Sequence, residues 1–169
     1  MGIRSTAALL LGASLLAPAP ASAAEASPWT PYRTDDFTAA AGRTCAFELH
    51  GEVLEDQERY RTTAWFPDGS PRVQEFTGRL VVRYTNTATG ASAVRNLTGR
   101  SDFEYFADGG WTLTDVGGHF GAGLHPGDDP GPGFFVVDGS GWAVHADADG
   151  HRTLTTGQGT VENLCETLA

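Results

Sequence analysis

The sequence predicts an all-β protein, an antiparallel meander that closes into a barrel of about eight to ten strands. Three observations support this fold class. Val, Tyr, Phe, Trp and Thr alternate with polar residues over much of the chain. Turn sequences rich in Asp, Asn and Gly separate these stretches. No helical period continues for more than about two turns. A β-sandwich is the alternative architecture.

Residues 1–23 have the pattern of a secretory signal peptide. Arg4 precedes an apolar run from Ala7 to Leu16, and small residues end the stretch at Ala21 and Ala23. The run is too short for a permanent membrane helix, which needs ~20 residues, whereas the small residues suit a signal-peptidase site. We expect cleavage after Ala23 and secretion of an extracellular product with no membrane segment.

The charge balance limits the possible partners. The chain has 21 acidic and 11 basic residues and a net charge of −10, which becomes −11 when Arg4 is removed. Nucleic acids and anionic membrane surfaces are repelled by such a protein. Cationic ligands, Ca²⁺ and basic proteins remain possible partners, and we expect a monomer.

Residues 24–42 are predicted to form an irregular N-terminal arm, and residues 43–169 a single β-barrel domain. Pro28 and Pro31 interrupt any regular pattern in the arm, whose Trp29, Tyr32 and Phe37 we expect to pack over one end of the fold. A disordered tail is the alternative. Strands are then predicted at 43–53, 58–66, 72–86, 92–99, 102–106, 111–116, 134–138, 142–147, 151–156 and 159–168.

The stretch 72–86 is unusually long for one strand. At ~3.3 Å per residue it is too long for a flat sheet in a domain of this size, so we expect it to bend. Glycine commonly marks bulges and barrel corners, which makes Gly78 the predicted site of the bend.

Cys45 and Cys165 are the only two cysteines. In an exported chain such a pair predicts a disulfide, which here closes a loop of about 120 residues. We expect the last strand to pair with the first and the disulfide to join them where the barrel closes.

Residues 117–133 are rich in Gly and Pro and are predicted to be a long loop, either a ligand gate or a plain connector. The loop contains His119, His125, Asp128 and Asp129, whose side chains are types that bind divalent metals. Flexible backbone gives these weak candidates no fixed geometry, so neither a metal nor a cofactor is expected.

Aromatic residues give the only indication of a ligand site. They recur at predicted strand positions, and we expect them to share one interior: Tyr84, Phe103, Tyr105, Trp111, Phe134 and Trp142. A fully packed core is one interpretation. A small apolar cavity is the other, because barrels of about eight strands are just wide enough for one small ligand.

No catalytic signature is present. The chain has no Gly-x-Ser-x-Gly elbow, no dinucleotide fingerprint and no His-Glu-x-x-His motif, and with 21 acids, carboxylate pairs arise by chance. The sequence therefore favours a non-enzymatic protein that binds a small apolar ligand or an extracellular partner. The alternative is an isomerase or cyclase that acts on an apolar small molecule.

An ordered set of motifs resembles an uncharacterised family of small secreted actinobacterial proteins. The motifs are Cys45-Ala46-Phe47 and the stretches 77–86, 95–99 and 159–165, and the likeness covers nearly the whole chain after residue 23. The resemblance implies export, a cystine and an all-β domain. It transfers no functional residue.

Overall fold

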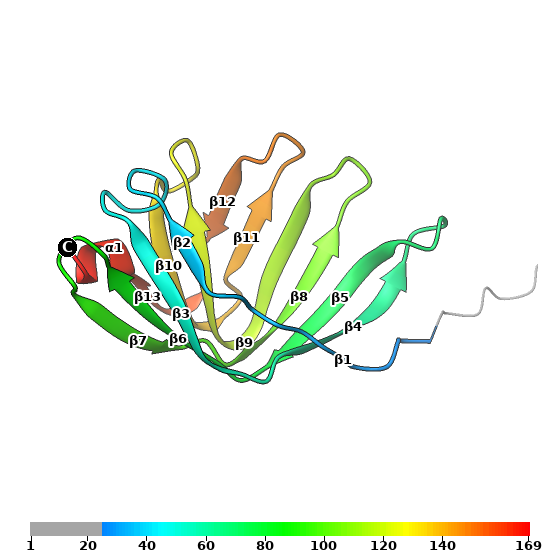
Figure 1. Cartoon of the computed structure of the whole chain (residues 1–169). Coiled ribbons are helices and arrows are strands. Elements are labelled where there is room, and N and C mark those ends of the chain that lie inside the picture. Colours follow the sequence, from blue (N-terminus) through cyan, green and yellow to red (C-terminus); the bar gives the residue numbers. More distant parts are fainter. Residues whose placement is uncertain (1–24) are drawn as a thin grey trace, which may run out of the picture.

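The computed structural model describes residues 25–169, so the predicted signal peptide lies outside the described residues. This part of the chain is mostly antiparallel β-structure (Figure 1). The strands are β1 (Thr30–Pro31), β2 (Phe37–Ala39), β3 (Leu49–Asp56), β4 (Arg59–Trp65), β5 (Pro71–Gly78), β6 (Leu80–Asn86), β7 (Ser92–Asn96), β8 (Gly99–Tyr105), β9 (Trp111–Leu124), β10 (Gly133–Ser140), β11 (Ala143–Ala146), β12 (Arg152–Thr155) and β13 (Gln158–Asn163). A short helix, α1 (Leu164–Thr167), follows the last strand.

The described residues form two open sheets, so the predicted closed barrel is wrong. The larger sheet has the order β1-β4-β5-β8-β9-β10-β13, with β11 paired to β9 and β12 to β11. The smaller sheet has the order β2-β3-β6-β7. The alternative prediction, a sandwich-like layout of packed sheets, fits this arrangement.

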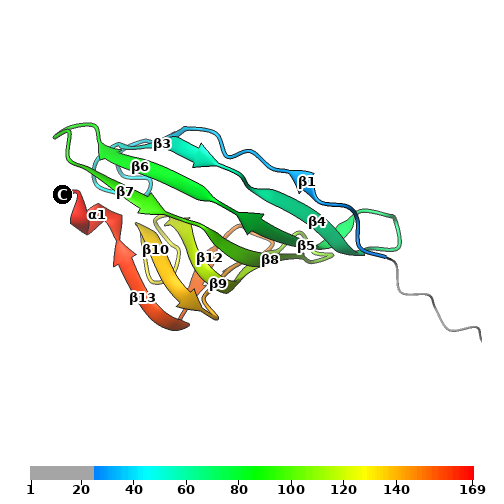
Figure 2. The same ribbon diagram turned by 90° about the horizontal axis from the view of Figure 1, so that it is seen from below.

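Consecutive strands run from one sheet into the other with almost no connection. β3 continues into β4, β5 into β6 and β7 into β8, and Figure 2 shows these pairs as long curved ribbons. In Figure 1, β4, β5 and β8 stand on one side of a trough, and β2, β3, β6 and β7 on the other. The predicted bend at Gly78 is confirmed, because β5 ends there and β6 begins at Leu80.

A row of glycines crosses the larger sheet where the strands bend. The register pairs Gly78 with Gly99, Gly99 with Gly118, Gly118 with Gly139, and Gly139 with Gly159. Four of the five have positive φ, at 146°, 105°, 139° and 125° for residues 78, 118, 139 and 159. A Cβ on Gly118 would lie 2.7 Å from the Cα of Gly99. The sheet can therefore crease along this line only because the row carries no side chains.

Strand β10 has a hydrophobic core on each face. Val136 packs with Tyr84 and Leu164 in a cluster shared with the smaller sheet. Its neighbour Val137 packs with Phe120 and Trp142 in a second cluster. Successive strand residues point to opposite faces, so both faces of β10 are covered, which explains its continuous apolar sequence.

The predicted Cys45–Cys165 disulfide is confirmed, with the two Cα atoms 5.2 Å apart. The pairing expected around it is wrong. Cys45 precedes β3, which begins at Leu49, and the C-terminal strand β13 pairs with β10 instead of with the first predicted strand. The disulfide thus anchors the segment before β3 beside the C-terminal helix.

The predicted loop 117–133 is mostly strand. Residues 117–124 belong to β9, and only 125–132 connect it to β10. The glycines have a packing role, because a Cβ on Gly121 would lie 3.0 Å from the ring of Phe134, which covers this stretch. Small residues at these positions let the aromatic ring lie directly on the sheet.

The N-terminal arm is more regular than predicted. β1 pairs with β4 and β2 with β3, so residues 30–39 form an interrupted edge strand along the trough. The expected packing of the arm's aromatic residues over one end of the fold is found only in part. Tyr32 contacts the rings of Tyr60 and Phe76, whereas Phe37 contacts those of Tyr84 and Phe134, so the two do not pack together. Trp29 lies under the guanidinium groups of Arg59 and Arg61, at 5.1 and 4.7 Å from its ring centroid.

Within residues 25–169, no helix has the length and apolar character needed to cross a membrane.

Candidate ligand-binding groove

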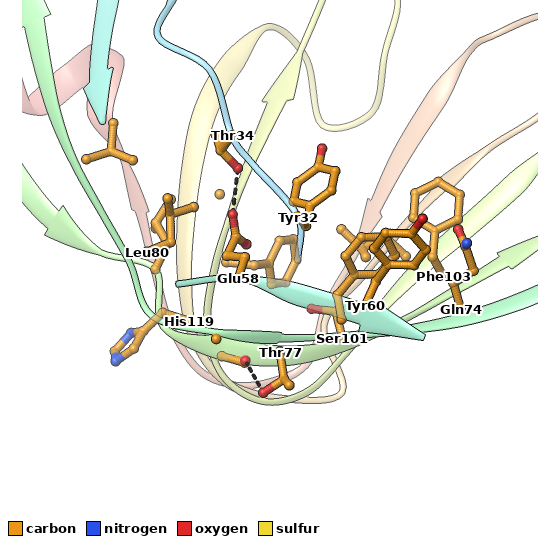
Figure 3. A pocket seen from close by; sticks show the side chains of 18 of the residues that line it. Tyr32, Thr34, Glu58, Tyr60, Gln74, Thr77, Leu80, Ser101, Phe103 and His119 are labelled. Carbon is orange, nitrogen blue, oxygen red and sulfur yellow. Dashed lines mark hydrogen bonds between the residues drawn. The ribbon is translucent and has the colours of Figure 1, made fainter. Parts of the chain in front are cut away.

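The trough contains a groove of about 640 Å³ on the concave side of the bent strands. Figure 3 shows its side chains converging from the arm and from strands β4, β5, β6 and β8. This volume falls in the usual range for small-molecule sites, about 300–1,000 Å³. Its wall is mainly aromatic and aliphatic, and includes Tyr32, Phe37, Tyr60, Phe76, Leu80, Val82, Tyr84, Leu97, Phe103, Tyr105, Leu113, Phe120 and Phe134.

Three aromatic rings form one end of the groove. Tyr60 and Phe76 face each other across β4 and β5 in the sheet register, and their rings stack with centroids 5.6 Å apart. Tyr32 from the arm meets both rings edge-on, at 6.4 and 5.4 Å. These distances suit attractive aromatic contacts. Tyr32 is 42% exposed, so this aromatic group remains accessible.

The aromatic surface continues along β8. Phe103 lies 6.4 Å from Phe76 and 4.6 Å from Tyr105, measured between ring centroids. It also stacks on Trp111 at 5.0 Å. Phe76 and Phe103 are half-buried, so the neighbouring rings cover them only in part and both line the groove.

The opposite end of the groove is closed by a more tightly packed aromatic group. Tyr84 is 1% exposed and lies 4.8 Å from Phe134, and Phe37 from β2 contacts both rings. These three residues belong to the main core as well as to the groove wall. This end of the groove is therefore closed and tightly packed, whereas the rings around Tyr32 at the other end are accessible.

Glu58 is the only acidic residue among the groove-lining residues that the structure describes. Its half-buried carboxylate accepts a hydrogen bond of 2.6 Å at Oε2 from the hydroxyl of Thr34. Burial raises the pKa of Glu58, the bond from Thr34 opposes this rise, and the nearby Asp56 adds to it. Figure 3 shows the Glu58–Thr34 pair beside Tyr32.

A second polar group lies at the β8 end of the groove. The Tyr105 hydroxyl donates to Oε1 of Gln74 at 3.0 Å, and Nε2 of Gln74 donates to the Thr62 hydroxyl at 3.3 Å. These two hydrogen bonds satisfy the polar atoms that form them and hold the Gln74 side chain in place. It can orient a ligand by offering remaining donor and acceptor positions.

No arginine or lysine is among the residues that line the groove in the described part of the chain. His119 belongs to the lining, but its imidazole points away from the groove in Figure 3 and lies 3.5 Å from the carboxylate of Asp138. The only charge that the lining presents to the groove is therefore the negative charge of ionised Glu58.

Four of the six predicted ligand contacts line this groove, namely Tyr84, Phe103, Tyr105 and Phe134. Trp111 lies behind them, stacked on Phe103 and covered by the guanidinium of Arg152 at 5.7 Å. Trp142 is 6% exposed, is buried in the second core cluster and does not line the groove.

The structure separates the four weak metal-ligand candidates. His119 contacts Asp138, whereas His125 pairs with Asp128 in the turn after β9. Asp129 bridges to β12 through its backbone. Within residues 25–169, no cluster of three or more His, Cys, Asp or Glu side chains has an arrangement able to hold a metal ion.

Sequence reasoning missed several groove residues, chiefly Tyr32, Glu58, Tyr60 and Phe76. Alternation indicated one of them, because Phe76 shares a predicted strand face with Tyr84 through Gly78. Tyr32 and Thr34 reach the groove through the arm, where no periodic pattern exists. Their positions depend on the pairing of β1 with β4 and β2 with β3.

Comparisons of the chain with protein-family models, with the curated proteins and with the solved structures gave no match.

Proposed function

We propose that this chain is a non-enzymatic binding protein that holds a small, largely apolar molecule in the groove. The supporting observation is the set of half-buried aromatic rings around an unfilled space of about 640 Å³. Apolar surface that stays uncovered in the groove forgoes burial worth ~25 cal/mol per Å². A ligand that covers Phe76 and Phe103 recovers that free energy.

The proposal includes export. The signal-peptide pattern of residues 1–23 and the Cys45–Cys165 disulfide both suit an oxidising, extracellular environment. The resemblance to small secreted actinobacterial proteins stays a prediction and agrees with this location.

The test is native mass spectrometry of the protein isolated without denaturation from the medium into which it is exported. We expect a mass excess that disappears on denaturation, because a small molecule is released. The Ser101→Trp variant should lack the excess, since Ser101 lines the groove and an indole there fills it. Circular dichroism checks that the variant is folded.

Arg100→Trp is the matched control. Arg100 precedes Ser101 on β8, is exposed and is not among the groove-lining residues, so this variant should keep the mass excess. A bare wild-type mass, together with no change in Nile red fluorescence on titration with the wild-type protein, would contradict the proposed function.

Catalysis is the second candidate function, as an isomerase or cyclase acting on an apolar substrate. Glu58 favours it, because a half-buried carboxyl with a raised pKa beside an apolar surface suits general acid or base chemistry. Incubating the released molecule with fresh protein separates the two functions. A binding protein returns the same compound, whereas an isomerase or cyclase returns a compound with altered retention or fragmentation.

A further inference from the structure

Within the proposed binding function, on which this inference rests, we propose that the ligand is an organic cation. Its ammonium group binds Glu58, and its apolar body lies along Phe76 and Phe103.

Glu58 has capacity for a further donor. Thr34 occupies Oε2, and no hydrogen bond or ion pair from residues 25–169 reaches the other oxygen, Oε1. The neighbouring Asp56 differs, because it accepts the backbone N–H groups of Thr34 and Glu58, each at 2.9 Å, and lies 3.9 Å from the guanidinium of Arg33. Asp56 is thus occupied by the protein itself, whereas Glu58 is available to a ligand.

The rings at this end of the groove suit a cation. Tyr32 lies at 89° to both Tyr60 and Phe76, so its ring forms one wall and the stacked Tyr60–Phe76 pair forms a second wall at right angles to it. Aromatic faces attract ammonium groups, and such walls are how proteins enclose alkylated ammonium ligands. A carboxylate next to them supplies the charge-assisted hydrogen bond.

The charge of the groove excludes the opposite ligand class. No Arg or Lys of residues 25–169 lines the groove, and the whole chain carries a net charge of −10. A fatty acid or another organic anion would bring its carboxylate toward Glu58 without a counter-charge, which is costly in a partly buried site. A cation is attracted both by the local carboxylate and by the long-range field.

The test uses three probes with the same body and different charge: 4-phenylbutylamine, 4-phenylbutan-1-ol and 4-phenylbutyrate. Their dissociation constants are measured by isothermal titration calorimetry at about pH 8, where the amine is protonated and the acid ionised. We expect the amine to bind about tenfold more tightly than the alcohol and the acid to bind most weakly. Glu58→Gln should bring the amine to the affinity of the alcohol and leave the alcohol unchanged.

Glu104→Gln is the control with the same change in net charge. Glu104 lies on β8 outside the groove lining, 45% exposed and paired with Arg72 at 3.5 Å. This variant should bind the amine as the wild type does. Equal affinities for the amine and the alcohol, or no effect of Glu58→Gln, would overturn the cation inference alone. If none of the three probes binds, the proposed groove function fails as well.

The affinity for the amine should also depend on pH. Burial holds the pKa of Glu58 above its ordinary value, so its carboxylate becomes protonated early as the pH falls. The other titratable groups around it are Asp56 and Arg33, next to it on the arm side, and the phenols of Tyr32 and Tyr60. Amine binding should be weaker at about pH 4.5 than at about pH 8, while alcohol binding should not change.

Discussion

At the scale of single residues, Arg95 and Glu162 connect the two sheets. Arg95 is in β7 of the smaller sheet and Glu162 is in β13 of the larger one. The guanidinium Nε and Nη2 donate to the two carboxylate oxygens, each at 2.6 Å, and the Thr167 hydroxyl adds a third bond at 2.7 Å. Bidentate pairs of this kind are stronger than ordinary surface ion pairs.

Replacing Glu162 by Gln should lower the free energy of unfolding by about 1 kcal/mol at pH 7. The hydrogen bond from Arg95 holds the pKa of Glu162 below its ordinary value, so the stabilisation is present above the unfolded pKa of about 4.3. It is lost as the pH falls through the lower folded pKa. Urea unfolding of both proteins measures this, and a difference that persists unchanged at about pH 2.5 would contradict the assignment.

At the same scale, the sequence could indicate which residues are aromatic but not which rings stay uncovered. Trp142 and Phe103 both fall in predicted strands, yet only Phe103 faces the groove. Trp142 is buried against residues of β9, β10 and β11. These strands come together through long-range pairing, which no local sequence pattern reveals. Glu58 could not be distinguished from the other acids in the sequence, because its contact with Thr34 depends on where the arm lies.

At the scale of elements, the glycine row lets the larger sheet crease where its strands come close together. Gly139 and Gly159 lie opposite each other, and a Cβ on either would overlap the backbone of the partner strand at Gln158 or Asp138. Both have positive φ, which disfavours any side chain. The crease therefore needs glycine for two independent reasons at these positions.

Replacing Gly139 by Ala should destabilise the fold by about 3 kcal/mol, since steric overlap adds to the cost of positive φ. Gly69→Ala is the matched control. Gly69 also has positive φ but has open space around its Cβ position, so its cost should be about 1 kcal/mol. Urea unfolding compares the two, and equal losses would show that the crossing of β10 and β13 is not sterically tight.

Most strands and hairpin turns were predictable because alternation and turn residues are local signals. One exception is residues 117–124, where glycines suggested a loop although Phe120, Ala122 and Leu124 alternate as in a strand. Glycine there accommodates the ring of Phe134 from the neighbouring strand. That contact cannot be read from either segment alone.

At the scale of the whole molecule, the predicted barrel differs from the observed open sheets in how the two ends of the chain pair. The disulfide was predictable because the chain has only two cysteines. It does not imply strand pairing, since Cys45 lies in the irregular segment before β3 and Cys165 in α1. Which edge β13 joins depends on the crease, and the crease depends on a cross-strand register of glycines that no single strand reveals.

The same bending produces the groove. Strands that cross from one sheet into the other leave a concave face, and the arm lies along its edge (Figures 1 and 2). A flat sheet with the same sequence would expose these rings, and a closed barrel would bury them. The creased sheet leaves them half-buried around a defined space, as a binding site requires.

The most direct measurement of the binding claim is an NMR titration of the ¹⁵N-labelled protein with 4-phenylbutan-1-ol, whose neutrality makes the result independent of ligand charge. We predict that the amide signals that shift belong to the groove-lining positions of β4, β5 and β8 and to Tyr32 and Thr34, while those of β12 stay in place. Shifts that are absent at millimolar probe, or that are scattered over β12 and the outer face of the sheet, would contradict the assignment of the groove as a ligand site.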